Sequence, residues 1–253
     1  MRKTVLLTLI VLAAATATNA QKLPNVQKES LRAPVNIKID GKATEWDNKF
    51  KAQNSATELL YTLSNDDENL YLTVQTKFKD VIDKIMRGGI TLNVNSTIDR
   101  KSGNQISLTY PSFDQAGASK VTNMLVVKNY PKANLDEEPV SIDNLNKAFA
   151  SQSKVIDVKG INGIPNGEVS IYNENGIQVA AHFDDEYGYT CELAIPVKYL
   201  SLPDNGSKPF SYQLKVNEPK QFSPKAGNRP PPPMKMTSVA ATDTWGEYTL
   251  AKK

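Results

Sequence analysis

The chain has 253 residues, and its 30 lysines and arginines nearly balance its 27 aspartates and glutamates. The basic residues are scattered rather than gathered in a stripe, which argues against a nucleic-acid-binding protein. One cysteine excludes an internal disulfide bond, and one histidine excludes a metal site built from several imidazoles. The sequence contains no CxxC, HExxH, phosphate-binding-loop or dinucleotide-binding motif.

Residues 1–20 have the pattern of a secretory signal peptide. Two basic residues precede an apolar run over residues 5–15, and small residues before Gln21 suit cleavage. The run is shorter than the ~20 apolar residues of a membrane-spanning helix, although a membrane anchor is the alternative interpretation. We expect an exported protein, periplasmic or secreted, with no transmembrane segment in the mature chain. Residues 21–34 are polar, contain two prolines and are expected to be a flexible lead-in.

From residue 35 onward, apolar and polar residues alternate in short runs separated by Asn, Asp and Gly, which is typical of half-buried strands. Apolar residues at helical spacing predict a short helix over residues 78–86, ended by two glycines, and a second over residues 142–149. We predict an all-β fold: an antiparallel β-sandwich, jelly-roll-like, with one or two short peripheral helices. The predicted strands cover residues 35–39, 57–63, 70–77, 90–94, 105–110, 121–127, 154–158, 169–172, 178–183, 189–195, 210–216 and 246–250.

Three short motifs carry a resemblance to a known family. They are an "IDG…EW" segment at residues 39–46, "DDENLYL" at residues 66–72 and a closing "WGEYTL" at residues 245–250. Together they resemble the family 9-like carbohydrate-binding modules of the DOMON-like β-sandwich superfamily, and the chain looks like an exported bacterial member. The resemblance covers roughly residues 35–253. It implies one β-sandwich domain over that range and non-catalytic binding of a carbohydrate or a related small ligand.

Aromatic side chains are the candidates for a sugar site. Flat rings cover the apolar face of a pyranose, and planar polar groups meet its hydroxyls. Trp245, beside a glycine at the start of the last predicted strand, is the leading candidate for a ligand platform. Tyr110, Phe113 and Tyr187 are further candidates, and packing in the core is the alternative for each. Trp46 is expected to plug one end of the core.

Four acidic residues in predicted turns, Asp40, Asp66, Asp67 and Asp184, are candidate ligands of a structural calcium ion. Hard carboxylate oxygens concentrated in loops suit Ca²⁺, and ordinary solvated turns are the alternative. No motif marks a pair of carboxylates for glycoside hydrolysis, so we expect no enzyme activity.

His182 and Cys191 each have a structural interpretation and a chemical one. His182 is expected to be a structural or surface residue, and an axial haem ligand is the alternative, because some DOMON-type domains bind haem. Cys191 lies in an alternating run and is expected to be a buried core thiol, with a reactive role as the alternative.

Two other functions stay open. Residues 224–233 end in four consecutive prolines, which favour a stiff extended segment. This segment, or an exposed sheet edge, would let the chain meet an envelope protein partner as an interaction or scaffold protein. A glycoside hydrolase accessory protein with hidden activity is the remaining alternative.

Overall fold

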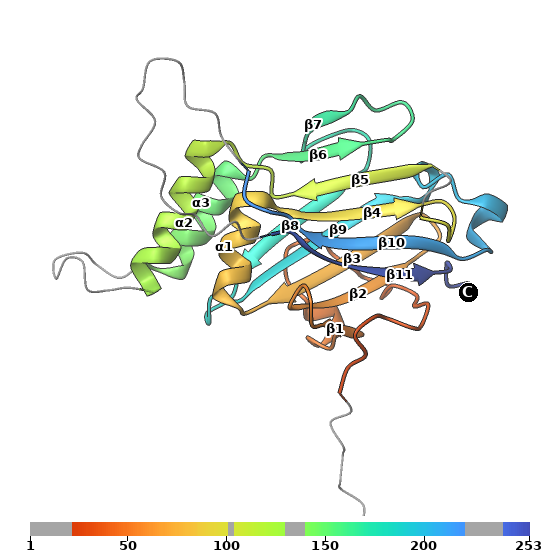
Figure 1. Cartoon of the computed structure of the whole chain (residues 1–253), viewed down its shortest axis with the longest axis horizontal. Coiled ribbons are helices and arrows are strands. Elements are labelled where there is room, and N and C mark those ends of the chain that lie inside the picture. Colours follow the sequence, from red (N-terminus) through yellow and green to blue (C-terminus); the bar gives the residue numbers. More distant parts are fainter. Residues whose placement is uncertain (1–21, 101–103, 130–139, 221–239) are drawn as a thin grey trace, which may run out of the picture.

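The computed structural model describes residues 22–100, 104–129, 140–220 and 240–253. Two antiparallel sheets, one of five and one of six strands, pack face to face (Figure 1). The predicted all-β sandwich is confirmed. In the described ranges three α-helices accompany the sheets, where the sequence predicted one or two short helices.

The five-stranded sheet has the order β1-β2-β3-β9-β8. The turn of its β2–β3 hairpin is closed by Asp66, whose Oδ1 accepts hydrogen bonds from the backbone N–H groups of Glu68 and Asn69 at 2.8 and 2.7 Å. The "DDENLYL" motif is therefore a hairpin, as its turn residues predict. The strands are β1 (Ala52–Asn54), β2 (Leu59–Asn65), β3 (Asn69–Thr76), β8 (Gln178–Phe183) and β9 (Tyr189–Pro196).

The six-stranded sheet has the order β11-β10-β4-β5-β6-β7, so the "WGEYTL" motif begins within an edge strand. A Cβ atom at Gly246 would lie 2.3 Å from the ring of Tyr212, so only glycine lets β11 approach β10 this closely. The strands are β4 (Ile90–Asn95), β5 (Gln105–Tyr110), β6 (Val155–Lys159), β7 (Gly167–Ser170), β10 (Phe210–Val216) and β11 (Thr242–Tyr248).

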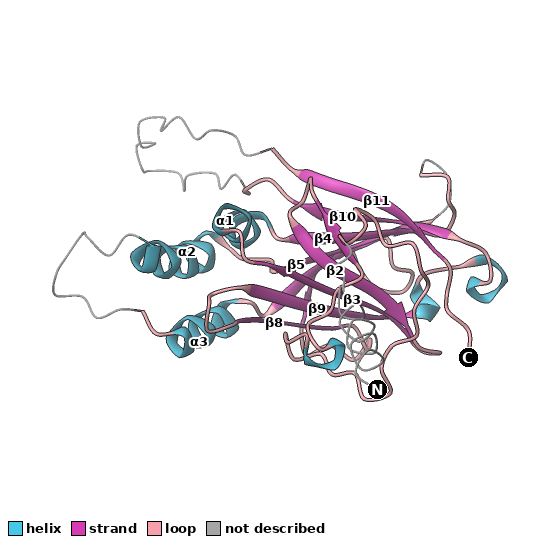
Figure 2. Cartoon of the chain, turned by 90° about the horizontal axis from the view of Figure 1, so that it is seen from below, coloured by secondary structure: helices cyan, strands magenta, loops and turns pink. Residues whose placement is uncertain are grey.

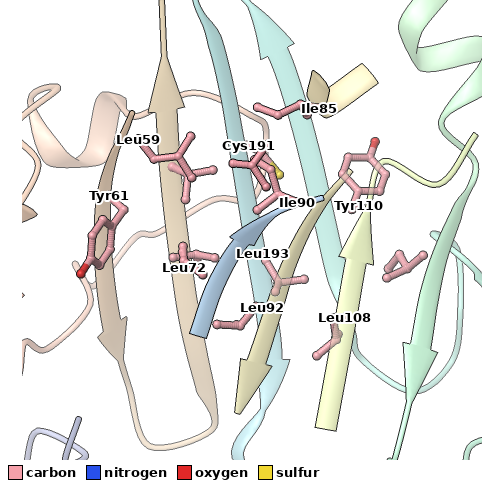
Figure 3. Close-up of a cluster of buried hydrophobic side chains, with 14 of the residues drawn as sticks. Leu59, Tyr61, Leu72, Ile85, Ile90, Leu92, Leu108, Tyr110, Cys191 and Leu193 are labelled. Atoms are coloured by element: carbon pink, nitrogen blue, oxygen red, sulfur yellow. The ribbon is translucent and has the colours of Figure 1, made fainter. Parts of the chain in front are cut away.

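The core lies between the two sheets and is built by period-2 alternation. Leu72 of β3 and Leu193 of β9 meet Leu92 of β4 and Leu108 of β5 from the opposite sheet (Figure 3). All four side chains are buried, and their sequence neighbours point to the outer faces. Each leucine removed from water stabilises the fold by roughly 1.5–3 kcal/mol.

Helices α1 (Lys79–Gly88), α2 (Gln115–Asn129) and α3 (Ile142–Gln152) lie together at one end of the strands (Figure 2). Phe149 of α3 closes this end of the core. Its ring makes edge-to-face contacts with Tyr110 and Phe113 on the side of the six-stranded sheet, and with Phe183 and Tyr189 of the five-stranded sheet, at centroid distances of 5.7 to 6.2 Å. Short 3-10 helices cover Thr44–Trp46, Val197–Tyr199 and Pro203–Gly206.

Residues 22–34, which the sequence predicts to be a flexible lead-in, lie along the edge of the five-stranded sheet and hydrogen-bond to β1 and β2. The side chain of Gln27 is buried, donates from Nε2 to the carbonyl of Leu63 at 2.7 Å and accepts from the Leu63 N–H at 2.8 Å. Farther along β2, the N–H of Asn65 donates to the carbonyl of Leu31, and the N–H of Ala33 donates to the carbonyl of Asn65. The lead-in thus protects the edge of β2.

Two strand predictions were wrong. Residues 121–127 belong to α2, because Ala118, Val121 and Leu125 recur at helical spacing and are buried against the core. This packing overrides the local preference of valine and threonine for strands. Residues 35–39 form a turn and loop in which Val35 is 99% exposed. Among the described residues, no helix combines the length and apolarity that a bilayer crossing requires.

Candidate ligand-binding face

The outer face of the six-stranded sheet, here called the polar face, carries a row of side chains across five strands. The strand register places Trp245 of β11 beside Gln213, Gln213 beside Asn93, Asn93 beside Ser107, and Ser107 beside Lys159 of β6. Asn93, Ser107 and Gln213 point outward, because the residues before and after each of them are core residues. Trp245 and Lys159 are directly opposite members of this row on neighbouring strands, so they lie on the same face. The three helices lie at the end of the strands rather than over this face (Figures 1 and 2).

The amides of the row are held in fixed orientations by hydrogen bonds. The Nδ2 of Asn93 donates to Oε1 of Gln213 at 2.7 Å, and the Nε2 of Gln213 donates to the carboxylate of Asp243. In the next row, the hydroxyls of Thr91 and Thr109 are 2.7 Å apart. Such planar, oriented donors and acceptors match the hydroxyl pairs of a sugar ring.

Trp245 supplies the aromatic surface of the row. Its side chain is half-buried, and the guanidinium carbon of Arg100 lies 4.8 Å from the ring centroid. This cation–π contact orders the ring and covers part of one face. The guanidinium of Arg100 adds hydrogen-bond donors beside the indole ring.

The structure separates Trp245 from the other three aromatic candidates. Tyr110 and Phe113 are only 6% and 5% exposed, and both pack against Phe149. Burial raises the pKa of Tyr110, as expected of a core phenol. Tyr187 is half-buried in the turn before β9, and its hydroxyl donates to the carbonyl of Val140 at 2.7 Å. Trp245 is thus the aromatic candidate that faces outward from a sheet.

The four acidic candidates do not form one group, and the carboxylate of Asp40 accepts a hydrogen bond from the backbone N–H of Lys42 at 2.9 Å. Asp66 accepts three hydrogen bonds within its own hairpin, including one from the Tyr71 hydroxyl at 2.6 Å. Asp67 pairs with Arg32 at 2.8 Å, while Asp184 accepts from backbone N–H groups of its own turn. Within the ranges that the structure describes, no group of three or more His, Cys, Asp or Glu side chains could hold a metal ion. Calcium binding stays a prediction, which melting in calcium or in a chelator would test.

His182, Cys191 and Trp46 occupy structural positions. Cys191 is buried and faces the core, as predicted, and burial raises the pKa of its thiol to about 12. His182 of β8 is partly buried, its Nε2 lies 3.4 Å from Nδ2 of Asn146, and burial lowers its pKa. Trp46 was expected to plug the core, but it lies half-buried in a 3-10 helix outside the core.

Two clefts lie away from the polar face. One, of about 580 Å³, is lined by Asp67, Lys198 and Lys253, among other residues, at one end of the sandwich. The other, of about 360 Å³, lies over the five-stranded sheet between Lys42 and His182. Both mix cations and carboxylates, and neither contains an exposed aromatic ring that could cover a sugar. The polar face is therefore the better candidate for a sugar site.

No protein-family model matches the chain, and no curated protein is similar to it at a significant level. The resemblance to family 9-like carbohydrate-binding modules therefore stays a hypothesis from the three motifs. The proline-rich segment 224–233, the basis of the scaffold alternative, lies outside the described residues.

Sequence reasoning missed four members of the row: Asn93, Ser107, Lys159 and Gln213. Each is the polar member of an alternating run, which is the only signal that the sequence carries. That signal predicts that a side chain points to an outer face of a sheet. It does not predict which strands are neighbours, and the row exists only through strand order and register.

Proposed function

We propose that this chain is an exported, non-catalytic carbohydrate-binding protein that holds a glycan on the polar face. The observation that carries the proposal is the row from Trp245 to Lys159, in which one aromatic ring, two ordered amides and a hydroxyl share one cross-strand line. The three sequence motifs of the resemblance support the same function independently.

The length of the row favours an oligosaccharide over a single sugar. Neighbouring strands lie about 4.8 Å apart, so five strands span about 19 Å, which is longer than one pyranose ring. Trp245 would cover the apolar face of one sugar, while Gln213, Asn93 and Ser107 would meet hydroxyls of the sugars that follow. Affinity should therefore rise from the monosaccharide to the tetrasaccharide of the recognised class and then level off.

Replacing Trp245 by alanine should weaken glycan binding at least tenfold, because the variant loses the only aromatic surface of the row. We suggest calorimetric titration of the mature chain with mono- to hexasaccharides of glucose, xylose, mannose and N-acetylglucosamine. Asn93→Ala should also weaken binding, and it leaves the aromatic ring in place. Tyr172→Ala is the matched control, since Tyr172 is 76% exposed and lies after β7, away from the row.

Two results would count against this site. Unchanged affinity in both Trp245→Ala and Asn93→Ala, with native folding, would remove the polar face from the binding site. Equal losses in Tyr172→Ala and Trp245→Ala would point to a general effect of removing surface aromatic rings.

A further inference from the structure

A buried carboxylate lies on the opposite side of the molecule, on the outer face of the five-stranded sheet. Glu192 of β9 points away from the core and yet is 0% exposed. Its Oε2 accepts hydrogen bonds from the backbone N–H groups of Asp40 and Gly41 at 3.1 and 3.0 Å, and its Oε1 lies 3.4 Å from the hydroxyl of Thr73. The residues of the "IDG" motif are what cover it.

The groups around Glu192 supply little positive charge to offset the burial of its carboxylate. The covering segment brings the carboxylates of Asp40 and Glu45 toward it, and its Lys42 lies in the adjacent cleft with His182. On the sheet, the cross-strand neighbours of Glu192 are Thr73 of β3 and Ala180 of β8, both uncharged. Among the described residues, no lysine or arginine forms an ion pair with Glu192.

Burial raises the pKa of Glu192 to about 7, since the two N–H donors offset only part of the desolvation, and the carboxylates of Glu45 and Asp40 raise the pKa further. The protonated side chain can keep all three contacts. Oε2 still accepts from both N–H groups, and a proton on Oε1 can point to the hydroxyl oxygen of Thr73.

A glycine lets the covering segment lie directly against the backbone of β8. Gly41 has a φ angle of +81°, and a Cβ atom there would lie 2.6 Å from the backbone carbon of Ala181. Two buried side chains follow Gly41 in the chain: Ala43 is 2% exposed and Phe50 is 6% exposed. Between these points the segment forms one wall of the cleft of about 360 Å³.

We propose that residues 40–48 form a pH-controlled strap, which is closed over the five-stranded sheet when Glu192 is protonated and is released as its carboxylate ionises. Release brings the carboxylate into water and removes the cost of burying its charge. It also opens the cleft between the strap and the sheet. The strap is separate from the polar face, so it does not depend on the proposed glycan site.

The direction and size of the effect follow from linkage. The pKa of Glu192 is higher with the strap closed than in water, so closure is most favourable below about pH 4.5 and loses stability as the pH rises through about 7. The difference between these two values corresponds to a change on the order of 100-fold in the opening equilibrium.

Hydrogen exchange of the Asp40 and Gly41 amides, measured by NMR on the mature chain, tests the proposal. Their protection factors, corrected for intrinsic exchange, should fall on the order of 100-fold between pH 4.5 and pH 8.5. They should be lower than those of β3 amides at every pH, because local release requires less free energy than global unfolding. Glu192→Gln, which cannot ionise and can make the same hydrogen bonds, should keep the protection at pH 8.5.

Three outcomes would overturn the proposal. The same fall in Glu192→Gln as in the wild type would assign it to another group. Protection that equals that of β3 would mean that the strap opens only when the whole domain unfolds. Protection that does not change with pH in the wild type would show that ionisation of Glu192 does not release the strap. In Gly41→Ala the added methyl group would clash with the backbone of Ala181, so the amides should show weak protection at every pH. Full protection in this variant would contradict the close contact between Gly41 and Ala181.

Discussion

Replacing Phe149 by alanine should lower the free energy of unfolding by about 3–5 kcal/mol, which is the usual cost of removing a buried aromatic ring. Phe149 is 1% exposed and packs against four other rings that come from both sheets and the loop after β5. Each edge-to-face pair adds to the loss of buried area, and the rigid strands cannot collapse into the cavity. Urea denaturation followed by circular dichroism measures the effect.

Lys147→Ala is the matched control for Phe149→Ala, because Lys147 is exposed on the same helix. It should change the free energy of unfolding by less than about 0.5 kcal/mol. A loss below about 1 kcal/mol in Phe149→Ala would contradict the view that this ring joins α3 to the two sheets.

Replacing Gln27 by alanine should cost about 2–4 kcal/mol, because it leaves two backbone groups of β2 without partners. The side-chain amide accepts from the N–H of Leu63 and donates to its carbonyl, and both contacts are buried. Each unsatisfied buried backbone group costs about 1–3 kcal/mol. The same urea titration measures the loss.

Lys28→Ala provides the control for Gln27→Ala, since Lys28 is the exposed neighbour in the same segment. Wild-type stability in Gln27→Ala would show that residues 22–34 are the flexible lead-in expected from sequence, and that they do not complete the sheet.

The sheets could be predicted from sequence because their alternation is strong and local. The expected ranges 105–110, 178–183 and 210–216 coincide with β5, β8 and β10. The pattern failed in α2, where a valine-rich run reads as a strand when its buried neighbour Ala118 is not considered. It gave no sign of the contacts of residues 22–34, where the side chain of Gln27 and the backbone groups of Leu31 and Ala33 hydrogen-bond to β2.

The two sites differ in how far the sequence predicts them. Trp245 could be chosen from residue type and a neighbouring glycine, and it lies on an outer face. Asn93 and Gln213 become its partners only through the register of β4, β10 and β11, and β4 lies far from the other two strands in sequence. Glu192 reads as an ordinary solvated residue of an alternating strand. Its burial depends on Asp40 and Gly41, about 150 residues earlier in the chain.

The most direct test of the central claim is a thermal-shift screen of residues 21–253 against mono- and oligosaccharides, with the wild type and Trp245→Ala side by side. Binding to the native state raises the melting temperature by mass action. We predict a rise with oligosaccharides of one sugar class in the wild type, and little or none in Trp245→Ala. A well-folded wild type whose melting temperature no sugar changes would contradict carbohydrate binding.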